Sequence, residues 1–159
     1  MNKFNMNLMK QALFLAEVAA SRDEVPVGAL IIRNGMIIGK GFNSKEIDQN
    51  PIAHAEILAI RAAARRMDNY RLIDTTLYVT LEPCIMCSGT IMQARIRRLV
   101  FGASDPKSGG VISLYGLLND KRLNHTVDVT GGVKREACAE ILGRFFDEKR
   151  ITSKTYSQS

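Results

Sequence analysis

Two short motifs bring together the residue types that bind metal ions. His54 lies in the sequence Ala-His-Ala-Glu, and Cys84 and Cys87 lie in Pro-Cys-Ile-Met-Cys. Two cysteines three residues apart at the start of a helix place both sulfur atoms on one side, where they can bind one ion. Thiolate and imidazole donors together favour zinc. The two motifs therefore predict a zinc site made by His54, Cys84 and Cys87.

The number of ligands distinguishes a structural zinc site from a catalytic one. Structural sites use four protein ligands, whereas catalytic sites use three and leave a position for water. Cys138 and His125 are the two candidates for a fourth ligand. Cys138 lies between two alanines of an expected helix, where a buried inert thiol is the commoner outcome, and His125 lies in a polar turn. We therefore expect an open site with three ligands.

Glu56 follows His54 by two residues and is the candidate for proton transfer. An ideal helix would place these two side chains on opposite sides. If His54 occupies an irregular first turn, which Pro51 favours, both can face the same ion. A carboxylate beside a zinc-activated water can take up its proton and pass it to a substrate. The alternative is a solvated carboxylate that merely interacts with the helix dipole.

Composition limits the class of protein. The chain has 159 residues, 46% of them hydrophobic, and a formal net charge of +6. This length fits one domain over residues 1–159 and leaves no room for two. Three cysteines are too few for a secreted disulfide framework. The positive charge is compatible with a nucleic-acid partner but does not require one.

The N-terminal segment loosely resembles a signal peptide, but two charged residues argue against that interpretation. Lys10 and Glu17 interrupt the region that would have to be apolar. No apolar run approaches the ~18 residues that a membrane span needs. We therefore expect an amphipathic first helix and a cytoplasmic location. Its buried stripe is expected to contain Met6, Met9, Leu13, Ala16 and Ala20.

Strand and helix patterns alternate along the chain, with one hairpin at Asn34-Gly35. This order predicts an α/β fold of three layers, in which helices cover both faces of a mixed five-stranded sheet. Residues from Thr152 onward are polar and are expected to fray. The strands are expected at residues 27–32, 36–41, 76–80, 98–102 and 126–129. After the first helix, further helices are expected at residues 53–67, 84–94, 114–118 and 134–150.

The combined motif, His-x-Glu followed by Pro-Cys-x-x-Cys, resembles the signature of zinc-dependent nucleobase deaminases. The chain resembles the cytidine deaminase superfamily and, within it, the bacterial tRNA-specific adenosine deaminases. This resemblance covers nearly the whole length and implies the cytidine deaminase-like fold. The segments that carry it are residues 24–29, 53–56, 77–84, 105–107, 123–125 and 145–146.

The resemblance implies hydrolytic deamination of the wobble adenosine in a tRNA anticodon to inosine. It assigns one Zn²⁺ per subunit to the three predicted ligands and proton transfer to Glu56. It also implies a homodimer whose RNA site draws on both subunits. Asn43 would hydrogen-bond the flipped base, and Pro26 and Val27 would line the base pocket. Further substrate-binding positions are Ala55, Asp105, Lys107, Asn124, Phe145 and Arg150.

The sequence departs from the pattern of these deaminases in three places and leaves three alternatives open. Ile52 stands where threonine is common, Tyr115-Gly116 where methionine and aspartate are common, and Asp147-Glu148 where basic residues are frequent. One alternative is a deaminase of a free base or nucleoside, of the cytosine or guanine type. Another is a zinc-stapled RNA-binding module without catalysis. The third is thiol–disulfide exchange by the two cysteines of the motif.

Overall fold

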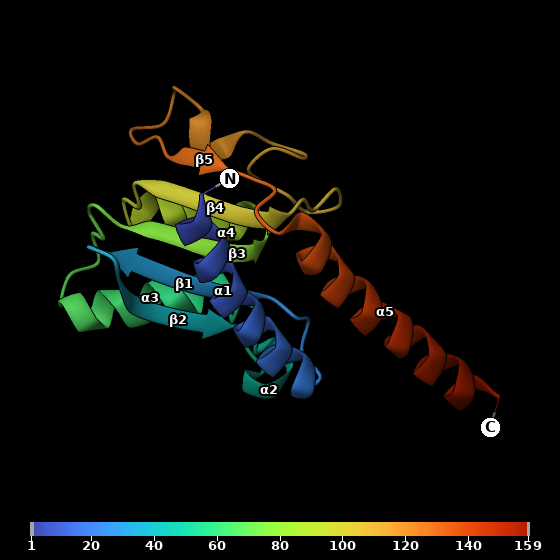
Figure 1. The fold of residues 1–159 in the computed structure, drawn as a ribbon. Helices are drawn as coiled ribbons and strands as arrows, with labels where there is room; N and C mark the ends of the chain where they lie inside the picture. The colour runs from blue at the N-terminus through green and yellow to red at the C-terminus, as the bar shows by residue number, and fades with distance from the viewer. Residues whose placement is uncertain (1, 159) are drawn as a thin grey trace.

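The computed structural model describes residues 2–158, which form one five-stranded sheet with helices on both faces (Figure 1). The strand order is β2-β1-β3-β4-β5. Strand β1 pairs antiparallel with β2 and β3, whereas β3, β4 and β5 run parallel. The expected mixed sheet is therefore confirmed. Its strands are β1 (Gly28–Arg33), β2 (Met36–Phe42), β3 (Thr76–Leu81), β4 (Arg98–Ala103) and β5 (Asp128–Thr130).

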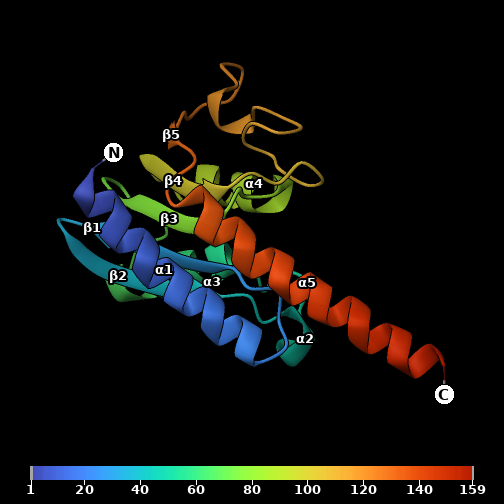
Figure 2. The same cartoon turned by 45° about the vertical axis from the view of Figure 1, so that its right-hand side comes forward.

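Two helices cover each face of the sheet. Figure 2 shows α1 and α5 side by side over one face, and α3 and α4 pack on the other. Two short helices, α2 and the 3-10 helix η1, lie in the connections. The bounds are α1 (Lys3–Ser21), α2 (Lys45–Asp48), α3 (Ala55–Met67), α4 (Ile85–Gln93), η1 (Leu117–Asn119) and α5 (Arg135–Ser157).

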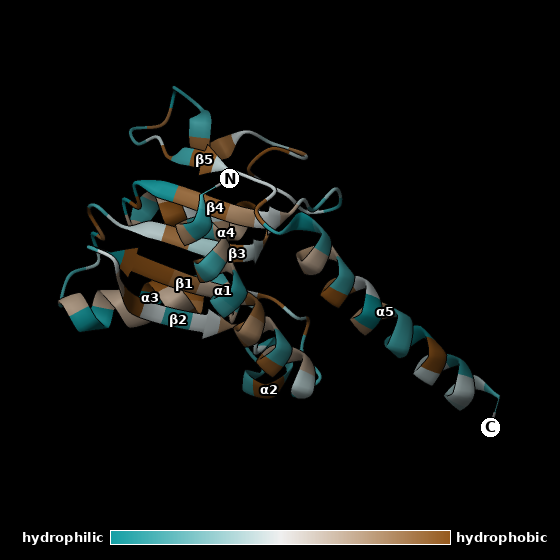
Figure 3. Cartoon of the chain, in the orientation of Figure 1, coloured by the Kyte–Doolittle hydropathy of each residue, from teal (hydrophilic) through white to brown (hydrophobic). Residues whose placement is uncertain are grey.

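Alternation along the central strands produces two separate cores. In β1, Ala29 and Ile31 pack toward α3 and α4, whereas Leu30 and Ile32 pack toward α1. Successive side chains of a strand point to opposite faces, so a strand covered on both sides is apolar throughout. The hydrophobic colouring of β1 in Figure 3 shows this pattern. The expected three-layer architecture is confirmed.

The buried face of α1 differs from the expected stripe. Met9 and Ala16 are buried as expected, but Met6, Leu13 and Ala20 are only partly buried. The buried face instead centres on Leu8, Ala12 and Ala19 and begins at Asn5. Asn5 turns inward because its Oδ1 accepts a hydrogen bond of 2.8 Å from the Tyr78 hydroxyl. Hydrophobic spacing alone cannot predict such a polar contact.

Other elements differ at their ends and faces. The expected loop at residues 43–51 contains α2, and the expected helix at residues 114–118 is replaced by η1. Helix α4 buries Cys87, Ser88, Ile91 and Met92. Helix α5 continues to Ser157, beyond the expected end at Arg150, and its last turns extend away from the sheet (Figure 1). None of the described helices is long and apolar enough to cross a bilayer.

Candidate active site

The three predicted metal ligands meet at the N-termini of two helices. His54 is the N-cap residue of α3 and Cys84 is the N-cap residue of α4, and both have an extended backbone. His54 Nδ1 lies 3.7 Å from Cys84 Sγ and 3.5 Å from Cys87 Sγ. Among residues 2–158, these side chains form the one group of histidine, cysteine or acidic residues whose donor atoms all lie within 4.8 Å of one another. Their donor set, two sulfurs and one imidazole nitrogen, fits zinc.

The electrostatics of this group favour a bound cation. A hydrogen bond from Cys87 lowers the pKa of the Cys84 thiol to about 4, and a hydrogen bond with His54 acts in the same direction. The pKa of Cys87 is raised, first by its hydrogen bond to Cys84 and then by burial. The pKa of His54 is raised, mainly by its hydrogen bond with Cys84. One thiolate is therefore present at neutral pH, and a metal ion would displace the remaining proton from the second thiol.

Glu56 is buried beside this group rather than solvated at the helix surface. It is the second residue of α3, and its side chain is 4% exposed. The extended backbone of His54 places that residue outside the regular helix, so the opposite-sides geometry of an ideal helix does not apply. Burial raises the pKa of Glu56 to about 7. The alternative of a solvated carboxylate is therefore wrong, and the carboxyl group can hold or release a proton near neutral pH.

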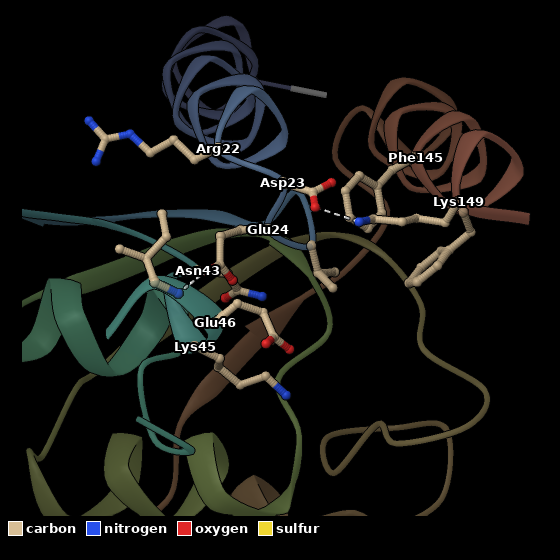
Figure 4. A pocket seen from close by; sticks show the side chains of 11 residues that line it. Arg22, Asp23, Glu24, Asn43, Lys45, Glu46, Phe145 and Lys149 are labelled. Carbon is tan, nitrogen blue, oxygen red and sulfur yellow. Dashed lines mark hydrogen bonds and ion pairs between the residues drawn. The ribbon is translucent and has the colours of Figure 1, made fainter. Parts of the chain in front are cut away.

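A cavity of about 250 Å³ opens in front of Glu56 and the metal-binding group. A wider cavity of about 610 Å³ shares Val25, Asn43 and Lys45 with it and extends to α5. Figure 4 shows Phe145 and Lys149 of α5 in this wider cavity, with Lys149 Nζ 2.6 Å from Asp23 Oδ2. The smaller cavity is lined by Val25, Val27, Asn43, Lys45, His54, Glu56, Leu81, Glu82, Cys84, Asp105 and Ser108.

The structure brings most of the predicted substrate-binding residues to these cavities. Val27, Asn43 and Asp105 line the smaller one, and Phe145 lines the wider one. Pro26 and Ala55 are buried beside the smaller cavity without lining it. A third cavity, of about 650 Å³, is lined by Lys107, Arg150 and four neighbouring residues of α5.

Asn43 has a second contact that orients its side chain. Its Oδ1 accepts a hydrogen bond of 2.8 Å from the backbone N–H of Ala55 at the start of α3. This bond satisfies an N–H group that the helix itself cannot pair. The side-chain NH₂ group of Asn43 then remains as the donor that it can offer to a ligand in the cavity.

Asn124 lies at the other end of the sheet. Its Oδ1 accepts a hydrogen bond of 3.4 Å from Arg95, and the neighbouring His125 ring lies 2.9 Å from the carbonyl oxygen of Ile96. Arg95 and Ile96 come before the amino end of β4, whereas the metal-binding group follows the carboxyl end of β3. Because β3 and β4 run parallel, these two places lie at opposite ends of the sheet. The chain therefore does not bring Asn124 to its own cavity.

Neither candidate for a fourth ligand joins the metal-binding group. Cys138 is buried in α5 and packs against Gly102, where burial raises its pKa to about 11. His125 contacts the backbone of Ile96 instead. Within the described chain, three side chains form the group, which matches the ligand number of catalytic rather than structural zinc.

Sequence reasoning missed one buried residue of this site, Glu82. Its side chain is 2% exposed and accepts hydrogen bonds from the loop after β4. Burial acts to raise the pKa of Glu82, but hydrogen bonds from Ser113, Asp105 and Ile112 outweigh it and lower the pKa below its ordinary value. Only its place directly before Pro83 and Cys84 could have drawn attention to it.

Comparison with known proteins agrees with this geometry. The family model for MafB19-like deaminases matches residues 1–150. The tRNA-specific adenosine deaminase of Haemophilus influenzae is 46% identical over 154 residues, covering 96% of this chain and 89% of that protein. The same enzyme of Bacillus subtilis is 44% identical over 146 residues, covering 92% and 91%. This chain belongs to the tRNA-specific adenosine deaminase family.

Solved structures of deaminases also share the fold of this chain. A structure from a study of A-to-I editing by tRNA:A34 deaminases superposes with a TM-score of 0.82 at 43% identity, covering 84% of this chain and 97% of that chain. The guanine deaminase of Nitrosomonas europaea superposes with a TM-score of 0.76 at 25% identity, covering 86% and 81%. The cytidine deaminase-like fold of the family is thereby confirmed.

Proposed function

We propose that this protein deaminates the adenosine at the wobble position of a tRNA anticodon and produces inosine. The observation that carries the proposal is the placement of a buried proton carrier, Glu56, beside the His54–Cys84–Cys87 group at a cavity of about 250 Å³. In this hydrolysis, water adds to C6 of adenine, the C6–N bond breaks, and ammonia leaves. The family relatives at 44–47% identity are named for the same activity.

His54, Cys84 and Cys87 would hold one zinc ion. A zinc ion held there supplies a Lewis acid that activates water at neutral pH. The group of three donors leaves room for that water, as catalytic sites require. Two helix N-termini stabilise the thiolate form of the cysteines.

Glu56 moves the protons of the reaction. Its pKa of about 7 lets the carboxylate accept a proton from water and donate it to the ring nitrogen of adenine. The carboxylate then takes up the proton of the new hydroxyl group on C6 and passes it to the amino group, which leaves as ammonia. Its burial keeps bulk water from competing for the proton during transfer.

The shape of the site fits a base that has left the stack. A base held inside a helical stem could not enter a cavity of about 250 Å³, so the adenine must swing out of the anticodon loop. Val27 offers an apolar wall, and the NH₂ group of Asn43 offers a donor to the base. The neighbouring nucleotides then lie over the wider openings, where Lys107, Phe145 and Arg150 are available.

We also propose a homodimer of single-domain chains in the cytoplasm, where tRNA is available. Asn124 supports the dimer, because it lies away from the cavity of its own chain. An RNA contact by Asn124 during this reaction therefore requires a second subunit. Light scattering of the purified protein at micromolar concentration would give twice the mass of the chain, and a monomer that remains active would contradict this part.

The test of the function is inosine formation in an RNA stem-loop that carries the anticodon. The purified zinc-loaded protein is expected to convert adenosine at the wobble position and to leave a matched stem-loop with adenosine only at other loop positions unchanged. Ammonia release from free guanine or cytosine, without any from the stem-loop, would favour the free-base alternative. Zinc binding and RNA binding without any deamination would favour the non-catalytic alternative.

A further inference from the structure

The side chain of Glu82 accepts hydrogen bonds from a loop that lies more than 20 residues further along the chain. The residue follows β3, and its backbone N–H donates to the carbonyl oxygen of Ala103 at the end of β4 over 2.8 Å. The loop that leaves β4 then folds back over the Glu82 side chain. The bonds to the carboxylate come from the backbone N–H groups of Asp105 (2.9 Å), Val111 (3.3 Å), Ile112 (2.7 Å) and Ser113 (2.8 Å) and from the Ser113 hydroxyl.

The two oxygen atoms of Glu82 accept different sets of hydrogen bonds from this loop, and only Oε2 bonds to Asp105. Oε1 accepts the N–H groups of Val111, Ile112 and Ser113. Oε2 accepts the N–H group of Asp105 and the hydroxyl of Ser113. A carboxylate has about four lone-pair positions, so these five donors use its full capacity. Glu82 therefore has no oxygen free for proton transfer, although it lines the same cavity as Glu56.

The Asp105 end of the loop shapes the cavity. Asp105 and Ser108 line it, and the Asp105 side chain accepts the N–H groups of Lys107 and Ser108 at 3.1 Å. The orientation of this turn therefore depends on the position of the Asp105 backbone. That position is fixed by the bond to Glu82 Oε2.

The middle of the loop contacts the backbone just before α4, where the first metal-binding cysteine lies. Gly109 forms a backbone bridge with Cys84, and the Gly110 N–H donates to the carbonyl oxygen of Pro83 over 2.9 Å. A Cβ atom at Gly109 would lie 2.5 Å from the Glu82 carboxylate, so the backbone passes directly over it. One side chain therefore supports both the substrate side and the cysteine side of the cavity.

We propose that Glu82 is a positioning residue that sets the Asp105–Ser108 turn for substrate binding. The inference rests on the proposed function, because it concerns the affinity of that reaction for RNA. Glu82→Gln separates the two ends of the loop. Its remaining oxygen can keep the three N–H groups of residues 111–113, but its NH₂ group would then face the N–H of Asp105, and two donors cannot bond.

Three measurements on Glu82→Gln test the proposal. The variant is expected to keep one zinc per chain, to lose exchange protection at the Asp105 amide but not at Ile112, and to raise KM for the stem-loop about tenfold with kcat within about twofold. Glu140→Gln makes the same chemical change on an exposed part of α5 and should match the wild type. A purely structural role would lower stability without separating KM from kcat.

Other results would overturn the proposal. A fall in kcat at unchanged KM would place Glu82 in the chemistry, and loss of zinc would place its main effect at the cysteines. If the variant does not fold, amide exchange of the wild type decides: the Asp105 amide must exchange slowly, and exchange as fast as in an exposed turn contradicts the proposal. Failure of the wild type to deaminate the stem-loop would instead contradict the proposed function, and the exchange data would still judge the role of Glu82.

Discussion

Glu56 and Glu82 line the same cavity and both side chains have almost no solvent-exposed surface, yet their surroundings differ. Burial dominates at Glu56 and raises its pKa to about 7. Glu82 accepts four backbone N–H groups and a hydroxyl, and its pKa is lowered. Glu56 is surrounded by protein on all sides, whereas Glu82 lies less deep and has many hydrogen-bond donors. Deeper burial at Glu56 and the supply of donors at Glu82 together decide which carboxyl group keeps its charge. Glu56 is suited to moving protons and Glu82 to holding a loop.

Removal of a metal ligand beside Glu56 is expected to have the largest effect. Cys87→Ala takes away one of the three donors, so the protein should lose its zinc and its deaminase activity should fall to background. Metal analysis and the stem-loop assay measure both changes. Cys138→Ser is the matched control because Cys138 lies outside the group, and it should keep its zinc. Loss of zinc from that control would show that the site has a fourth ligand.

Glu56→Gln tests the proton-transfer half of the comparison. The amide cannot accept and return a proton, so kcat should fall by about 10²–10⁴-fold while zinc is retained. Glu140→Gln, on the exposed side of α5, serves as the control. A variant with full activity and full zinc content would disprove the role of Glu56.

The raised pKa of Glu56 also predicts how stability depends on pH in the metal-free protein. Its folded-state pKa of about 7 lies above its ordinary value of 4.5, so the fold disfavours the charged form. As the pH rises from about 5 to about 8, the wild type should therefore lose stability relative to Glu56→Gln. Urea unfolding of both proteins at the two pH values measures the difference. A stability difference that does not change with pH would contradict the raised pKa.

Substitutions of the residues proposed to contact RNA should raise KM and leave kcat unchanged, as expected for Glu82→Gln. The rise in KM should be smaller than for that variant. Arg150→Ala removes a cation from the cavity that α5 shares with Lys107. RNA affinity should fall a few-fold, and the slope of log affinity against log salt should decrease by about 0.7 if one phosphate contact is lost. Lys154→Ala removes a charge from the same helix, one turn further on, outside the residues lining these cavities. An equal effect of both variants would indicate general attraction rather than a contact by Arg150.

Sequence reasoning predicted the order of strands and helices because local patterns determine them. A β-branched apolar run and the Asn34-Gly35 turn located the hairpin, and the His-x-Glu and Cys-x-x-Cys motifs located the metal-binding group. The boundaries of most central elements were predicted within one or two residues. These features depend on neighbours in the sequence, which a single chain displays directly.

Features that depend on distant contacts were not predictable in the same way. The inward turn of Asn5 depends on Tyr78, 73 residues away, and the role of Glu82 depends on a loop more than 20 residues further on. Phe146 is 46% exposed, whereas the neighbouring Phe145 is buried. Such contacts arise only when the layers pack, so periodicity does not reveal them.

The central claim is tested most directly by inosine formation in an anticodon stem-loop. The zinc-loaded wild type should convert the wobble adenosine, Glu56→Gln should be nearly inactive, and Glu82→Gln should recover near wild-type turnover when the RNA is saturating. This result would show that one buried carboxylate moves protons and the other positions the substrate. A wild type that deaminates a free base but never the stem-loop would contradict the account.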